Sequence, residues 1–255
     1  MPDFGELLEV TKTIVSKAAS SILSGQDIES KHYIHCANMP KEIKAFADDA
    51  LNRDILSELL PLGIPVLSEE SGYTNSSTHT DFCFVVDPLD GTFNFVKGLG
   101  PSAVSIALWH DKTPVFGVIY NLSERKLFWG GRGLGAFVDD EPIMVSATGD
   151  RRIASICTGF PVRFDVEDSQ TIDEFWRTVH PFGKVRMIGS AAISLTLVAQ
   201  GAADVYFEQG IMLWDVAAGL AIVQGAGGYT SFTPTPTQYS LNVFASNGKT
   251  DLCNT

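Results

Sequence analysis

The chain has 255 residues, of which 45% are hydrophobic and 19% are charged, and its formal net charge is −12. This composition is typical of a globular protein with a large core. The negative charge argues against a nucleic-acid backbone or an anionic membrane as partner. No apolar stretch approaches the length of a membrane span, and the first residues lack the features of a secretory signal, so we expect a cytoplasmic location.

The length allows one large domain or two closely associated lobes. Near residue 148 the pattern changes from consecutive strands to alternating strands and helices. We therefore predict an N-terminal α+β lobe over residues 1–147 and a C-terminal α/β lobe over residues 148–255. The cysteines form no CxxC pair, which favours reduced thiols over disulfides or a zinc site. They are Cys36, Cys83, Cys157 and Cys253.

The first lobe begins with two segments of helical periodicity. Apolar residues at three- and four-residue spacing predict helices over 4–24 and 42–60, the first ended by Gly25. A short strand over 64–67 leads into a polar loop. The strands predicted after that, bounded by turn residues, are 82–86, 103–109, 115–120, 126–129 and 135–138. The glycine-rich run 131–135 lacks the spacing of a dinucleotide-binding loop and predicts a hairpin turn.

The second lobe alternates strands with helices. Its helices are predicted over 170–179, 190–200 and 215–224, and its strands over 152–157, 203–208 and 241–245. The threonine- and proline-rich run 233–237 predicts a loop.

The most informative segment is the apolar strand 82–86 and the residues that follow it. It leads directly into two carboxylates, Asp87 and Asp90, and Pro88 between them is expected to end the strand ladder. Gly91 and Thr92 then predict a tight turn whose N–H groups point outward. Hard oxygen ligands beside N–H donors suit a divalent metal that meets a phosphate.

Further acids lie where a layered fold could bring them together. Glu69 and Glu70 follow the strand 64–67, Asp215 begins a predicted helix, and Asp48 lies on the second predicted helix. Each has an ordinary alternative: Asp215 is typical of a helix cap, and the two glutamates are typical of a solvated loop.

Three motifs in this order resemble the inositol monophosphatase family of Mg²⁺-dependent, lithium-sensitive phosphatases. They are Glu69-Glu70-Ser71, Asp87-Pro88-Leu89-Asp90-Gly91-Thr92 and Trp214-Asp215-Val216-Ala217-Ala218-Gly219, with accessory matches at Thr158-Gly159-Phe160-Pro161, Gly189-Ser190-Ala191-Ala192 and Tyr206-Phe207-Glu208. The resemblance implies a fold of the α+β or α/β class, a layered αβαβα sandwich with the site between two lobes. It also implies a homodimer.

The resemblance further implies a role for each matched residue. Glu69, Asp87 and the Leu89 carbonyl would hold one Mg²⁺, and Asp87, Asp90 and Asp215 would hold a second, with a third ion in some members. Glu69, Thr92 and Asp48 would be catalytic, the last two by orienting a water and removing its proton. The residues that would contact the substrate are Asp90, Gly91, Thr92, Gly189, Ser190, Ala191, Glu208 and Asp215.

Some matches are incomplete, and they leave alternatives open. Ala45 stands where the family usually has threonine, and Asp49 lies beside Asp48, so either acid could pair with Thr92. Residues 190–192 could equally cap and pack a helix. Asn94-Phe95 favours a polyol or sugar monophosphate such as inositol-1-phosphate as substrate. The alternatives are a 3′(2′),5′-bisphosphate nucleotidase, a fructose-1,6-bisphosphatase, and a non-catalytic metal-binding relative.

Overall fold

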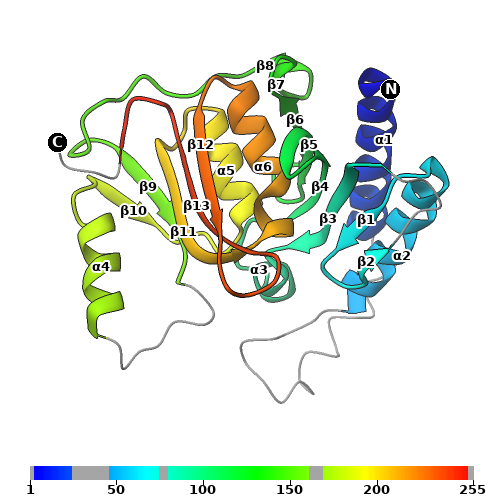
Figure 1. Cartoon of the computed structure of the whole chain (residues 1–255), viewed down its shortest axis with the longest axis horizontal. Helices are drawn as coiled ribbons and strands as arrows, with labels where there is room; N and C mark the ends of the chain where they lie inside the picture. The colour runs from blue at the N-terminus through cyan, green and yellow to red at the C-terminus, as the bar shows by residue number, and fades with distance from the viewer. Residues whose placement is uncertain (1–2, 25–45, 75–79, 161–168, 252–255) are drawn as a thin grey trace.

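The computed structural model describes residues 3–24, 46–74, 80–160 and 169–251, which form five layers (Figure 1). The first layer is α1 (Phe4–Leu23) with α2 (Phe46–Leu59), which ends in a short 3₁₀ turn (Leu60–Leu62). The part of the second predicted helix before residue 46, and Gly25, lie outside the described residues. Apolar side chains of both helices pack on one face of the larger sheet.

The larger sheet has the strand order β2-β1-β3-β4-β5-β6-β7-β8. Its strands are β1 (Val66–Ser68), β2 (Gly72–Thr74), β3 (Phe82–Asp90), β4 (Ala103–His110), β5 (Thr113–Asn121), β6 (Lys126–Gly131), β7 (Gly135–Val138) and β8 (Glu141–Pro142). Strand β3 is covered on both faces: Phe84 and Val86 pack toward α1 and α2, and Val85 packs toward the middle helices. This double burial explains its unbroken apolar run.

The middle layer consists of α5 (Ala191–Ala199) and α6 (Leu213–Gly225). Both helices are almost entirely apolar, as expected for helices with a sheet on each side. A single core cluster joins them to residues of both sheets.

The smaller sheet has the order β10-β9-β11-β13-β12. Its strands are β9 (Ser155–Thr158), β10 (Lys184–Arg186), β11 (Val205–Met212), β12 (Tyr229–Pro234) and β13 (Ser240–Ser246). Helix α4 (Ser169–Val179) covers its outer face through Phe175 and Val179. The layers therefore run helix, sheet, helix, sheet, helix, and the predicted αβαβα sandwich is confirmed (Figure 1). The division into lobes at residue 147 stays a prediction.

Several local predictions were wrong. Pro88 does not end β3: the strand continues to Asp90, which pairs with Ala103 after a register shift beyond Asp87. A proline is tolerated there because the ladder is already irregular. The run 233–237 is a loop only in part, because β12 reaches Pro234 at the edge of its sheet.

Other short elements were not predicted at all. They are β2, β8, β10, β12 and the one-turn helix α3 (Thr92–Lys97). Strands β2, β8 and β10 have at most three residues, too few for a periodic pattern. The glycine-rich run 131–135 does form the predicted hairpin between β6 and β7. No helix in the described ranges is long and apolar enough to cross a membrane.

Candidate metal centre

Glu69 directly follows β1 and Asp87 lies within β3, and both come just after the last residues paired between these two parallel strands. Strands β1 and β3 run parallel, with Ser68 opposite Val86, so the next residue of each strand is one of these two acids. The Glu69 N–H donates to the Val86 carbonyl at 3.1 Å, which continues the ladder by one step. The parallel register thus brings the two carboxylates together from positions 18 residues apart.

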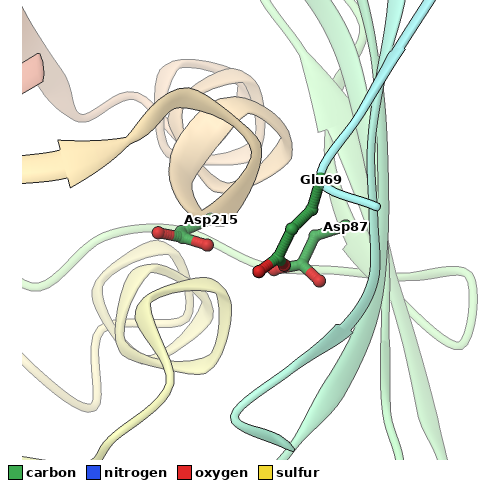
Figure 2. Close-up of side chains that lie close together, drawn as sticks. All are labelled: Glu69, Asp87 and Asp215. Carbon is green, nitrogen blue, oxygen red and sulfur yellow. The ribbon is translucent and has the colours of Figure 1, made fainter. Parts of the chain in front are cut away.

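Asp215 reaches the same point from the middle layer. Figure 2 shows its carboxylate, at the start of α6, facing those of Glu69 and Asp87. One carboxylate oxygen from each of the three residues lies within 4.8 Å of the others. Asp215 also accepts a hydrogen bond from the Met212 N–H at 3.2 Å, so it caps its helix as well as joining the cluster.

Asp87 is the most confined of the three. Its side chain is fully buried, and its Oδ1 atom accepts a hydrogen bond from the Leu89 N–H at 3.0 Å. Its Oδ2 atom is buried and has no hydrogen-bond partner among the described residues. Burial raises the pKa of Asp87 well above its ordinary value, and the charges of Glu69, Asp90 and other nearby acids raise it further.

The pKa of Asp215 is raised in the same way, first by burial and then by Asp90 and Glu69. Asp87 and Asp215 share the acidic neighbours that raise their pKa values, and a cation would stabilise their ionised forms. A donor set made only of oxygens suits a hard ion such as Mg²⁺. The trio of Glu69, Asp87 and Asp215 therefore fits a divalent metal.

Asp90 lies between the cluster and the start of α5. Its Oδ2 atom accepts hydrogen bonds from the Ser190 hydroxyl and from the Ala192 N–H, the latter at 2.8 Å. Burial raises the pKa of Asp90 to about 6, although these hydrogen bonds lower it. Ser190 in turn accepts from the Ile193 N–H at 3.2 Å, so the expected alternative of a helix cap is correct for Ser190.

Gly91 joins β3 to α3 in a conformation that other residues rarely adopt. Its φ is +77°, and a Cβ atom there would lie 3.1 Å from the Pro101 carbonyl oxygen and 3.2 Å from that of Gly189. Thr92 follows as the first residue of α3. Glycine at this position allows the chain to turn sharply between the acids of β3 and Thr92.

The structure distinguishes between Asp48 and Asp49. Asp48 is buried on α2, whereas Asp49 is exposed. The Thr92 hydroxyl donates to the Leu89 carbonyl at 2.8 Å and lies 3.4 Å from Oδ2 of Asp48. Asp48 is therefore the acid beside Thr92.

Glu208 lies on β11, near the acidic cluster but with a different partner. Its carboxylate accepts a hydrogen bond from the Tyr206 hydroxyl at 2.9 Å. Burial raises its pKa to about 7, the Tyr206 hydrogen bond lowers it, and the charge of Asp90 raises it. The charge of Asp90 raises the pKa of Glu208, and the charge of Glu208 raises the pKa of Asp215, so the charged neighbours of Glu208 in this network are acids.

Two polar contacts around the site were not predicted. Tyr206 is one, although its position two residues before Glu208 in a strand places both side chains on the same face. The other is Asn94, whose amide donates to the Pro101 carbonyl at 3.0 Å and to the Ile188 carbonyl at 2.8 Å. Asn94 so connects α3 to the loop that carries Gly189, a contact between distant segments that no local pattern indicates.

Comparison with known proteins identifies the family of this chain. A sequence profile described as "Inositol monophosphatase family" matches residues 6–249. The chain belongs to the inositol monophosphatase family. The inositol-1-monophosphatase of Synechocystis is 40% identical over 186 residues, which is 72% of this chain and 64% of that protein. The match therefore spans less than two thirds of this relative's length.

Other family members carry a different name. The Nus factor SuhB of Xylella fastidiosa is 33% identical over 204 residues, covering 79% of this chain and 72% of that protein. Among solved structures, the inositol monophosphatase of Anabaena superposes with a TM-score of 0.80 at 30% identity, covering 97% of this chain and 93% of that one. Proteins of this family use Mg²⁺, and the acidic trio of this chain could bind it.

Proposed function

We propose that this protein is a Mg²⁺-dependent phosphomonoesterase that hydrolyses a small polyol or sugar phosphate, such as inositol-1-phosphate. The observation that carries the proposal is the convergence of the Glu69, Asp87 and Asp215 carboxylates within 4.8 Å, with one buried Asp87 oxygen lacking a hydrogen-bond partner among the described residues. Such a cluster is costly without a cation, and it lies beside the Gly91 turn, where N–H groups can receive a phosphate.

The proposed metal ligands divide into two sets that share Asp87. Glu69, Asp87 and the Leu89 carbonyl would hold one ion, and Asp87, Asp90 and Asp215 would hold another, with two or three ions at turnover. Bound Mg²⁺ would supply a water of lowered pKa and positive charge for the phosphate oxygens.

The protein's own groups complete the proposed chemistry. The N–H groups of Gly91 and Thr92 would donate hydrogen bonds to the phosphate and stabilise charge on its equatorial oxygens. The Thr92 hydroxyl, 3.4 Å from Oδ2 of Asp48, would orient the attacking water and pass its proton to that carboxylate. Glu69 would help Thr92 and Asp48 to hold the same water.

The surroundings of Glu208 support a substrate with neutral hydroxyl groups. Its carboxylate accepts hydrogen bonds, and the neighbouring charges of Asp90 and Asp215 are also negative. Sugar or inositol hydroxyls would donate to Glu208, with Gly189, Ser190 and Ala191 lining the same side. A second phosphate placed there would be repelled, which disfavours bisphosphate substrates.

A panel of substrates tests this proposal against its enzyme alternatives. We expect Mg²⁺-dependent phosphate release to be fastest from inositol-1-phosphate, slower from fructose-1,6-bisphosphate, and slowest from a 3′,5′-bisphosphate nucleotide. If phosphate is released faster from either bisphosphate than from inositol-1-phosphate, that bisphosphate is the better substrate and the proposed preference is wrong. Equal, slow release from all of them would remove any specific assignment.

The same panel tests a function without catalysis. The relative from Xylella fastidiosa is named a Nus factor, and a non-catalytic metal-binding protein is the alternative from a different class. The net charge of −12 disfavours direct contact with a nucleic-acid backbone. Binding of Mg²⁺ without phosphate release from any substrate would favour the non-catalytic alternative.

Three further properties complete the proposal: the first two rest on the family resemblance, and the third rests on the composition and the first residues of the sequence. We propose a homodimer, inhibition by lithium, and a cytoplasmic location. Sedimentation and activity at millimolar lithium would measure the first two.

A further inference from the structure

The hydroxyl of Tyr206 has one evident purpose in this fold. The ring is fully buried in the cluster around α5 and α6, where phenylalanine would pack equally well. The hydroxyl, however, donates to Oε2 of Glu208 at 2.9 Å. A buried phenol needs an acceptor, and here that acceptor is the carboxylate we assign to the substrate's hydroxyl groups.

Gly159 confines the same carboxylate from the neighbouring strand. Strands β9 and β11 run parallel, with Thr158 opposite Phe207, so Gly159 lies beside Glu208. A Cβ atom on Gly159 would approach both Glu208 carboxylate oxygens, to 2.7 Å and 2.8 Å. Any side chain at position 159 would therefore push the carboxylate away from its present place.

We propose that Tyr206 and Gly159 are positioning residues that set substrate selectivity by holding the Glu208 carboxylate toward the hydroxyl groups of the substrate's alcohol portion. Tyr206 fixes one oxygen by its hydrogen bond, and Gly159 leaves the space that the carboxylate occupies. The inference rests on the proposed phosphatase function and adds the two residues that act through Glu208.

The expected consequence is selective. A substrate whose leaving group carries hydroxyls depends on the orientation of Glu208, whereas p-nitrophenyl phosphate has no hydroxyl to offer. The metal ligands and Thr92 are untouched by either substitution, so the chemical step at phosphorus is unchanged. The positioning role predicts a change in KM for one substrate class and none for the other.

The experiment compares Tyr206→Phe and Gly159→Ala with the wild type, using inositol-1-phosphate and p-nitrophenyl phosphate in the presence of Mg²⁺. Because hydrogen bonds to charged groups are among the stronger ones, we expect KM for inositol-1-phosphate to rise about five- to twentyfold in each variant. The kcat for that substrate, and both constants for p-nitrophenyl phosphate, should stay within about twofold. Tyr120→Phe, on the larger sheet, is the matched control and should change neither substrate.

Two further readouts separate positioning from general stability. In a Glu208→Gln variant, adding Tyr206→Phe should not raise KM for inositol-1-phosphate further, because the effect of Tyr206 passes through the missing carboxylate. In a crystal structure of Tyr206→Phe without substrate, the Glu208 carboxylate should leave its wild-type position. The inference is overturned if that carboxylate stays in place or if activity falls equally on both substrates. It is also overturned if the effects of Tyr206→Phe and Glu208→Gln on KM multiply in the double variant.

The structural readout also separates this inference from the proposed function. If the Glu208 carboxylate moves in Tyr206→Phe but the wild type releases no phosphate, the positioning role is supported and the phosphatase function is refuted. If the carboxylate does not move but the wild type is an active phosphatase, the positioning role is refuted and the phosphatase function is supported.

Discussion

Asp87 and Asp204 are both buried aspartates, but their surroundings are opposite. Asp204 accepts hydrogen bonds from the Ser146 hydroxyl at 2.6 Å, the Ser155 N–H at 2.7 Å and the Ser155 hydroxyl at 3.1 Å. Asp87 has acidic neighbours, and one of its oxygens has no hydrogen-bond partner among the described residues. The donors around Asp204 account for its buried charge within the fold, whereas the buried Asp87 Oδ2 atom, which has no hydrogen-bond partner among the described residues, is explained by a binding site.

The pKa values follow the same division. Burial opposes the ionisation of Asp204, but hydrogen bonds from Ser146, Ser155 and Thr148 outweigh it and lower its pKa. At Asp87 the single hydrogen bond from the Leu89 N–H does not outweigh burial and the neighbouring acids, and the pKa is raised. Through these hydrogen bonds Asp204, just before β11, holds Ser146 of the segment between the two sheets and Ser155 at the start of β9.

The largest effect is expected at Asp90, which we place in the metal site although one of its oxygens is hydrogen-bonded. Asp90→Asn should lower Mg²⁺-dependent phosphate release by about a thousandfold or more, because a ligand that supports charge on the reacting oxygens is lost. Thermal unfolding should be nearly unchanged. Steady-state assays and calorimetry measure both, and near-native turnover in this variant would refute the two-metal assignment.

A smaller effect, of a different kind, is expected at Asp204. Asp204→Ala should lower the free energy of unfolding by about 2 kcal/mol, because it removes the acceptor of half-buried donors on Ser146 and Ser155. At a temperature where the variant remains folded, kcat should match the wild type. Denaturant titration with parallel assays tests this, and a stable but inactive Asp204→Ala would contradict the division between the two aspartates.

The smallest effect is the pH dependence of that stabilisation. Since the folded-state pKa of Asp204 is lowered, its contribution is complete above the unfolded value of about 4 and is lost as the pH falls through the folded value. The difference in unfolding free energy between wild type and Asp204→Asn should therefore be constant from pH 7 to 5 and shrink below 4. A difference that grows on acidification would mean that Asp204 is not stabilised as the anion.

The fold could be predicted where segments are long and periodic. Helix α1 and strands β4 and β5 follow apolar patterns that local sequence carries by itself. The passage of β3 through Pro88 could not be predicted, because the register shift that tolerates the proline depends on the pairing with β4. The three-residue strands β2 and β10 exist because neighbouring strands present unpaired edges to them.

The site shows the same limit. Acids that follow two apolar runs indicate where Glu69 and Asp87 lie, since the parallel pairing of β1 and β3 ends just before both residues. The choice of Asp48 over Asp49 needed the packing of α2, which buries one and exposes the other. The contact between Asp90 and the start of α5 joins residues 100 positions apart and has no local signal.

The central claim is that the Asp87 Oδ2 atom, which no donor in the described part of the chain reaches, belongs to a divalent-metal site. Isothermal titration of the metal-free protein with Mg²⁺ tests it directly, with Asp87→Asn and Asp204→Asn as a matched pair of buried substitutions. We predict that the wild type and Asp204→Asn bind Mg²⁺ alike and that Asp87→Asn shows no measurable binding. Equal binding by Asp87→Asn and the wild type would contradict the claim.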